Sequence, residues 1–191
     1  MEIILASASP RRRELLERMG LEFRICTAEH DETMDLSASA ESEACRVSRL
    51  KAEAVQALCR SDALIIAADT IVVCEGRILG KPADEEEAYE MLRLLSGREH
   101  RVITGLCVLQ GERVRCVSEV TKLRFRELSD EQIRAYIATG EPMDKAGAYG
   151  IQGKASVFVP GIEGDYYNVM GLPVCTLAQI LEEFGIVLPG Q

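Results

Sequence analysis

The sequence predicts an α/β domain with a mixed β-sheet, and three observations support this fold class. Its 191 residues match one domain of ordinary size, or two very small ones. A hydrophobic share of 47% is enough to bury a core, which excludes a disordered chain. Strand-like and helical segments are joined by both crossovers and hairpins, so one sheet should contain parallel and antiparallel pairs. Because no repeat or linker interrupts the chain, residues 1–191 are expected to form a single domain.

Capping and turn residues mark where several elements should begin and end. Ser9 and Pro10 are the cap and first residue expected of a helix, and Ser129 is the expected cap of a later one. Residues 75–76 and 111–112 have the composition of two-residue hairpin turns. Strands are expected at residues 2–6, 21–27, 62–68, 71–74, 77–79, 100–110, 113–126 and 156–159, the last within an irregular region at 142–173. Helices are expected at residues 9–20, 40–59, 84–96, 129–140 and 175–185.

The charge and cysteine content exclude several functional classes. Acidic residues outnumber basic ones by 31 to 22, and the net charge of −9 argues against binding to nucleic acid or an anionic membrane. The seven cysteines are scattered without a C-x-x-C pair, and only two histidines are present, so no zinc cage is expected. The short apolar run at the N-terminus and the lack of a long apolar stretch predict neither a signal peptide nor a membrane span. A cytoplasmic protein with reduced cysteines is therefore expected.

Three consecutive arginines open the first predicted helix. Cations at a helix N-terminus oppose the helix dipole, whereas a phosphate chain would be attracted to both. Arg11, Arg12 and Arg13 therefore indicate an anion site. The alternative is that they are solvated and are neutralised by Glu14 and Glu17.

Lys51 lies on the apolar stripe of the helix predicted at 40–59, four residues after Val47 and three before Ala54. Such a lysine either extends outward past the core or points its ammonium into an internal anionic pocket. The spacing alone leaves both placements open.

Asp69 and Thr70 follow the buried strand predicted at 62–68, and strand ends of this kind bind ligands in α/β sheets. An aspartate there can hold Mg²⁺, activate a water molecule or cap the next turn. If residues 75–76 form a two-residue turn, Thr70 lies opposite Lys81, which brings an ammonium beside Asp69. The alternative is an ordinary surface salt bridge.

Other common motifs are absent from the sequence. It has neither the P-loop pattern nor G-x-G-x-x-G, and no Ser-His-Asp or Cys-His set stands out. The glycine-rich segments at 144–153 and 164–173 could serve simply as turns.

Taken in order, seven segments resemble the Maf family, whose members act as nucleoside triphosphate pyrophosphatases. The resemblance runs from residue 3 to about residue 185. It implies a fold similar to the inosine triphosphate pyrophosphatases, with an elongated mixed sheet flanked by helices and two lobes around a central cleft. The segments are S-x-S-P-R-R at 7–12, Asp31-Glu32, the helix carrying Lys51, A-D-T at 68–70, G-K-P at 80–82, K-A-G-A-Y-G-I-Q-G at 145–153 and D-Y-Y-N-V-M-G-L-P at 165–173.

The resemblance implies a role for individual residues. The family's catalytic proton acceptor corresponds to Asp69, and its substrate-specificity positions correspond to Arg11, Thr70 and Gln152. The motif at 145–153 places the chain with the dTTP/UTP enzymes rather than with the subclass that prefers 7-methyl-GTP. Hydrolysis between the α and β phosphates would give a nucleoside monophosphate and pyrophosphate.

An acidic protein must neutralise a triphosphate locally, with cations and metal. Glu32 and Asp69 are expected to hold one or two Mg²⁺ or Mn²⁺ ions. The amide of Gln152 could match the O4 and N3–H edge of uracil or thymine, or could instead contact backbone or phosphate. The expected phosphate-binding residues are Ser9, Arg11, Arg12, Lys51 and Lys81.

These observations predict a metal-dependent dTTP/UTP pyrophosphatase with water as nucleophile. One alternative is a Maf-type pyrophosphatase for another or a modified nucleotide. Another is a nucleotide-binding regulator of cell division. A homodimer is expected only by analogy with the family.

Overall fold

The computed structural model of the chain describes residues 1–29, 33, 38–60 and 62–188. The chain divides into two compact units. The first comprises Met1–Asp69, Thr104–Glu119 and Gly171–Gln191, and the second comprises Thr70–Ile103 and Val120–Met170.

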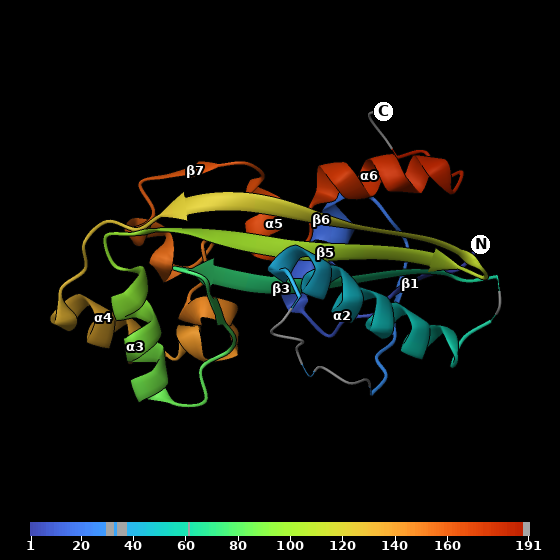
Figure 1. The fold of residues 1–191 in the computed structure, drawn as a ribbon. Coiled ribbons are helices and arrows are strands. Elements are labelled where there is room, and N and C mark those ends of the chain that lie inside the picture. The colour runs from blue at the N-terminus through green and yellow to red at the C-terminus, as the bar shows by residue number, and fades with distance from the viewer. Residues whose placement is uncertain (30–32, 34–37, 61, 189–191) are drawn as a thin grey trace. The chain divides into compact units, whose positions relative to one another are not determined.

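The strands form one mixed sheet in the order β2-β1-β3-β5-β6-β7, with β4 paired to β3 (Figure 1). Strand β1 is parallel to both β2 and β3, whereas β3–β4 and β6–β7 are antiparallel pairs. The predicted α/β fold with a mixed sheet flanked by helices is confirmed. The strands are β1 (Ile3–Leu5), β2 (Arg24–Ile25), β3 (Leu64–Cys74), β4 (Arg77–Leu79), β5 (Glu99–Gln110), β6 (Arg113–Arg124) and β7 (Gly161–Glu163).

The helices agree with the predicted positions to within a few residues. Helix α5 and the three short 3₁₀ helices fall in the region predicted to be irregular. Of the described helices, none is long and apolar enough to cross a membrane. The helices are α1 (Pro10–Arg18), α2 (Ala40–Gln56), α3 (Glu85–Leu95), α4 (Asp130–Ile137), α5 (Tyr166–Met170) and α6 (Val174–Glu183), with 3₁₀ helices η1 (Glu141–Asp144), η2 (Ala146–Ala148) and η3 (Lys154–Phe158).

In the first unit, α2 and α6 cover opposite faces of the sheet (Figure 1). Alternate residues of β6 show this directly, because successive side chains of a strand point to opposite faces. Cys116 packs against the core under α2. Arg115 forms an ion pair with Glu183 of α6, and Glu119 accepts a hydrogen bond from Thr176 of α6. The core under α2 consists of Ile4, Ala6, Ala52, Val55, Ala63, Ile65, Ala67, Cys107 and Leu109.

Strand β3 corrects one prediction. Two apolar runs separated by Asp69 and Thr70 were expected to form separate strands, but the structure has one continuous strand of 11 residues. Asp69 and Thr70 are its two half-buried members, and the others are buried. The prediction that Asp69 ends a strand is therefore wrong. Two polar residues need not interrupt the backbone hydrogen bonds of a strand, and the Asp69 carboxylate is stabilised by an ion pair with Lys51.

The β3–β4 hairpin confirms the predicted turn and corrects its extension. Glu75 and Gly76 both have positive φ (49° and 76°), as a tight hairpin turn requires. The pairing ends at Val72–Leu79, so the predicted pair between Thr70 and Lys81 does not form. Directly after the last pair, the carbonyl of Gly80 accepts a hydrogen bond from the N–H of Gly147.

The region at 142–173 differs most from expectation. The strand predicted at 156–159 is wrong, because these residues form the end of η3 and the chain that follows it. The buried side chains of η3 are Ala155 and Phe158, whose spacing of three suits a 3₁₀ helix. Phe158 packs edge-on against Tyr136, with ring centroids 5.2 Å apart. Strand β7, which has no buried residue, was not predicted.

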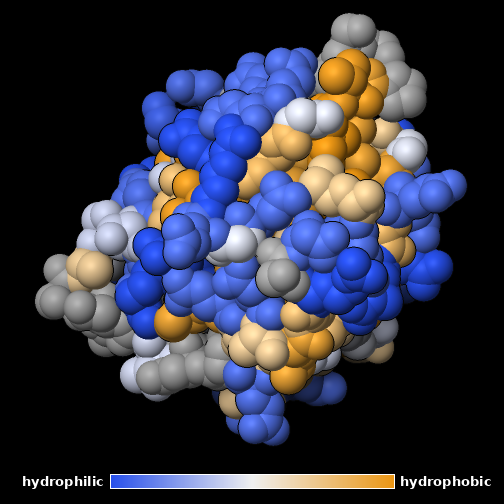
Figure 2. Space-filling model, turned by 90° about the vertical axis from the view of Figure 1, so that its right-hand side faces the viewer, coloured by the Kyte–Doolittle hydropathy of each residue, from blue (hydrophilic) through white to orange (hydrophobic). Residues whose placement is uncertain are grey.

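The surface seen in Figure 2 is mostly hydrophilic, and its apolar residues form separate patches. Among the described residues, the most exposed large apolar side chains are Val187, Leu58, Val157 and Met1.

His100, in the second unit, should make stability depend on pH. Its ring is 2% exposed, lies edge-on to Phe125, and has Nε2 2.8 Å from the hydroxyl of Tyr149. Burial lowers the pKa of His100 to about 4. Between pH 6.5 and 4 the unfolded chain binds a proton at His100 that the folded chain does not. The contribution of the neutral, buried His100 to the free energy of unfolding is therefore complete above pH 6.5 and is lost as pH falls toward 4. We expect a loss of about 3 kcal/mol by pH 4.

Urea unfolding at several pH values measures this effect. The difference between the native chain and His100→Gln isolates the histidine from other titrating groups. An identical pH slope in the two proteins would contradict the prediction.

Candidate functional site

The candidate site in the first unit is built on an ion pair between α2 and β3. Lys51 Nζ lies 2.6 Å from Asp69 Oδ1, and the two side chains are only 14% and 15% exposed. Charges so withdrawn from water interact more strongly than a surface pair does. Of the two placements that the sequence left open for Lys51, the structure has the ammonium turned inward onto a carboxylate.

Arg12 adds a second cation to this region. Its Nε donates to the carbonyl of Gly171 at 2.8 Å, and its Nη1 donates to Ser7 Oγ at 3.1 Å. Burial lowers the pKa of Arg12 to about 10, the negative charge of Asp69 opposes this shift, and the positive charge of Arg11 adds to it. Arg12 is thus held by neighbours on both sides and lies within the field of the Asp69 carboxylate.

The N-terminus of α1 has the predicted cap. Ser9 Oγ accepts a hydrogen bond from the N–H of Arg12 at 3.5 Å, and Pro10 is the first helical residue. Ser7 Oγ accepts from the N–H of Ser9 at 3.2 Å, so it joins the cap to the Arg12 guanidinium. Sequence reasoning missed this role of Ser7, although Ser7 is the first residue of the S-x-S-P-R-R segment.

The three consecutive arginines at the start of α1 differ in their environments. Arg13 forms an exposed ion pair with Glu17 at 2.8 Å, as the alternative interpretation expected. Glu14 pairs with Arg18 instead, at 2.6 Å. Arg11 and Arg12 are half-buried. Arg13 therefore has an ordinary surface role, and the anion-site hypothesis depends on the first two arginines.

Three further predicted site residues, Thr70, Lys81 and Gln152, belong to the second unit. Thr70 follows Asp69 on β3 and is half-buried. Lys81, beyond the end of β4, and Gln152, between η2 and η3, are both exposed. The predicted metal ligand Glu32 lies outside the described residues.

Asp69 is the predicted metal ligand that the structure describes. The described part of the chain holds no cluster of three or more histidine, cysteine or acidic side chains suited to a metal ion. Mg²⁺ is nevertheless often bound by one or two carboxylates together with substrate phosphates. The half-buried Asp69 is a carboxylate of that kind, and the cation Lys51 beside it would help to hold the phosphates.

Comparison with known proteins assigns the chain to a family. The model of the family described as Maf-like protein matches residues 2–184. The chain belongs to the Maf family. Among similar Maf relatives, the "dTTP/UTP pyrophosphatase" of Thermococcus gammatolerans is 54% identical over 90% of this chain and 91% of its own length. The protein of the same name from Pelotomaculum thermopropionicum is 50% identical over 96% of this chain and 97% of its own.

A solved structure extends the likeness to the fold. The Staphylococcus aureus Ham1 protein superposes with a TM-score of 0.56, covering 96% of this chain and 100% of its own. At 15% sequence identity, this likeness concerns the fold alone.

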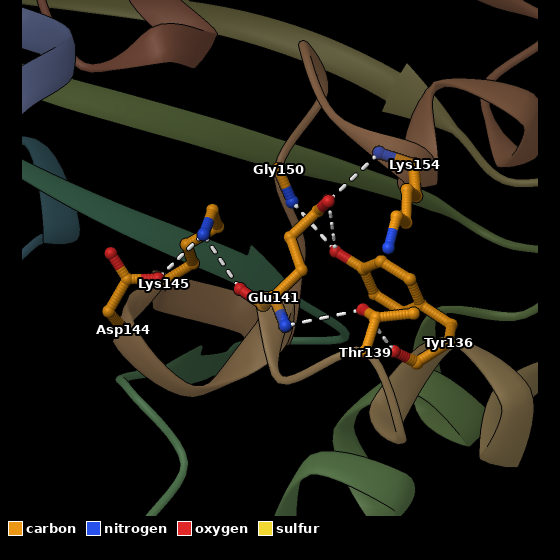
Figure 3. A network of polar contacts seen from close by, with 7 residues as sticks. All are labelled: Tyr136, Thr139, Glu141, Asp144, Lys145, Gly150 and Lys154. Carbon is orange, nitrogen blue, oxygen red and sulfur yellow. Dashed lines mark hydrogen bonds and ion pairs between the residues drawn. The ribbon is translucent and has the colours of Figure 1, made fainter.

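The Maf segment at 145–153, which carries Gln152, is anchored by Glu141 (Figure 3). Glu141 Oε1 accepts from the hydroxyl of Tyr136 at 2.9 Å, and Oε2 accepts from the N–H of Lys154 at 3.0 Å. The Tyr136 hydroxyl accepts in turn from the N–H of Gly150 at 3.2 Å. The Glu141 carboxylate therefore fixes the chain after Gln152 directly and the chain before it through the Tyr136 hydroxyl. Sequence reasoning missed this anchor, because nothing near Glu141 in the sequence indicates its partners.

Gly153→Ala should disrupt the anchor. A Cβ at Gly153 would lie 2.3 Å from Glu141 Oε1 and 2.6 Å from its carboxyl carbon, so the carboxylate would have to leave its partners. We expect a loss of about 1–3 kcal/mol in the free energy of unfolding. Gly80→Ala is the matched control, because a Cβ there meets nothing within 4 Å. Equal denaturant midpoints for the two variants would show that the anchor is unimportant for stability.

Proposed function

We propose that this Maf-family chain is a nucleoside triphosphate pyrophosphatase that hydrolyses dTTP and UTP to the monophosphate and pyrophosphate. The observation that carries the proposal is the half-buried Asp69 carboxylate, held at 2.6 Å by Lys51. It provides a proton acceptor and a phosphate-binding cation together, which is what hydrolysis of a phosphoanhydride needs. Relatives of about 50% identity that bear this activity in their names support the choice of substrate.

In this mechanism Asp69 orients the attacking water and accepts its proton. The water oxygen bonds to phosphorus as the anhydride P–O bond breaks, and pyrophosphate leaves. Lys51 holds Asp69 in place and neutralises phosphate charge. Arg12, fixed by Ser7 and Gly171, adds a positive charge that needs no rearrangement when charge develops.

We assign the other phosphate contacts to Ser9, Arg11 and Lys81. A divalent cation, Mg²⁺ or Mn²⁺, would be held by Asp69, by Glu32 and by the phosphates themselves. When bound, it would supply further neutralisation of the phosphate charge.

Base selection is assigned to Arg11, Thr70 and Gln152. The amide of Gln152 offers a donor and an acceptor, which match the O4 and N3–H edge of uracil and thymine. A base with the reversed pattern would leave that amide unsatisfied, and such mismatches discriminate strongly. The exposure of Gln152 and the anchoring of its segment at both ends suit this role.

A triphosphate panel tests the proposal. Release of pyrophosphate is measured from dTTP, UTP, CTP, ATP, GTP and 7-methyl-GTP, with Mg²⁺ or Mn²⁺ and after chelation. We expect dTTP and UTP to be the best substrates and chelation to abolish turnover. Preference for another base would point to a different Maf subclass, and tight binding without turnover would point to a nucleotide-binding regulator.

The compartment and assembly belong to the same proposal. All seven cysteines are free thiols, which suits the reducing cytosol. Light scattering of the purified chain would distinguish a monomer from the homodimer expected by analogy.

A further inference from the structure

The β5–β6 hairpin places two cysteines face to face. Its two-residue turn sets Gln110 opposite Arg113, and counting back sets Cys107 opposite Cys116. Because pairs alternate from the hydrogen-bonded pair that closes the turn, this is a non-hydrogen-bonded pair, with Cα atoms about 4.5 Å apart. That separation lies within the range of roughly 4.4–6.8 Å found in disulfides. The two Sγ atoms are 2.8 Å apart.

We propose that Cys107 and Cys116 form a redox modification site, which a peroxide converts to a disulfide across the hairpin. The inference depends on the geometry of the pair and not on the proposed enzymatic activity. Both sulfurs share one small space, so little backbone movement is needed to join them.

The two thiols differ in accessibility. Cys107 is fully buried, whereas Cys116 is half-buried and lies at the margin of the core under α2. An oxidant from solvent therefore meets Cys116 first, and Cys107 is the resolving thiol behind it.

The pKa values of the two thiols also make Cys116 the more reactive one. The contact between the thiols lowers the pKa of Cys116 and raises that of Cys107. Cys116 therefore loses its proton first, and Cys107 remains a thiol. Burial raises the pKa of both thiols. On α2, Arg49 favours the thiolates and Glu53 opposes them, while Cys45 is the third thiol facing Cys116.

The chemistry proceeds in two balanced steps. The thiolate of Cys116 attacks one peroxide oxygen and breaks the O–O bond, which gives a sulfenic acid and, after protonation, water. The thiol of Cys107 then attacks the sulfenic sulfur, and its proton leaves with the hydroxyl group as a second water. Two thiols are oxidised by two electrons, and one molecule of hydrogen peroxide is reduced.

Peptide mapping of the full-length chain tests the proposal. The protein is treated with stoichiometric hydrogen peroxide, remaining thiols are alkylated, and tryptic peptides are analysed without reduction. Cleavage after Arg113 and Arg115 separates Cys107, in peptide 102–113, from Cys116, in peptide 116–122. We expect these two peptides to be joined, with the loss of two hydrogen atoms and reversal by dithiothreitol. Recovery of both as alkylated thiols, while other cysteines are oxidised, would overturn the proposal.

Two variants sharpen the test. Cys175→Ser removes an exposed cysteine on α6 and should leave the cross-link unchanged. Cys107→Ser should abolish it and leave Cys116 as a sulfenic acid that dimedone traps. Oxidation should also raise Tm by several degrees in the native chain. If Cys107→Ser does not fold, the peptide map of the native chain still decides the question.

Discussion

Replacing Asp69 by Asn is expected to slow pyrophosphate release by about 10²–10⁴-fold, the usual contribution of a general base. Asparagine preserves the size of the side chain but cannot accept a proton from water at neutral pH. The neighbouring cations Lys51 and Arg12 remain, so nucleotide should still bind. The measurements are steady-state pyrophosphate release and calorimetric titration with dTTP or UTP.

Asp62→Asn is the matched control for this variant. Asp62 is exposed and pairs with Arg60 on the surface, so its replacement should leave the rate unchanged. A thermal melt checks that each variant folds, because the Asp69→Asn substitution leaves the Lys51 ammonium without its carboxylate partner. Full activity of folded Asp69→Asn would remove Asp69 from the mechanism.

Gly105→Ala is expected to destabilise the first unit by about 3 kcal/mol, at the upper end of overpacking effects. A Cβ at this position of β5 would lie 2.1 Å from the carbonyl oxygen of Ala44 and 2.6 Å from the N–H nitrogen of Cys45. Both atoms belong to the backbone of α2, so no side chain can rotate away. The whole helix would have to move, and it carries Lys51.

Gly161→Ala on β7 is the matched strand control, since a Cβ there meets nothing within 4 Å. Urea unfolding gives the free energy of each variant, and pyrophosphate release reports any displacement of Lys51. A Gly105→Ala protein as stable as Gly161→Ala would mean that α2 does not pack on β5 so closely.

Features determined by neighbouring residues were predictable from the sequence. The Ser9–Pro10 start of α1 and the turn at Glu75-Gly76 are examples, because capping and positive φ depend on residue types a few positions apart. The apolar stripe of α2 likewise limits the Lys51 side chain to two orientations, outward past the core or inward to an anionic group.

Features that depend on distant partners were not predictable. The pattern of residues predicts a strand end at Asp69, because it does not show that Lys51, 18 residues away, pairs with this carboxylate. The β3–β4 pairing ends before Lys81, and the carbonyl of Gly80 bonds to Gly147, which lies far along the chain. The contacts of Glu141 with Tyr136 and Lys154 leave no local pattern.

The uninterrupted course of β3 has a consequence for engineering. Asp69 sits in the interior of a strand, where adding or deleting one residue would turn every following side chain to the opposite face. Gln152, in contrast, is an exposed residue of a turn, so its side chain can be replaced without changing the register of a strand. New base preferences should therefore be sought by substituting Gln152 itself, with the anchored residues around it and the length of the strand unchanged.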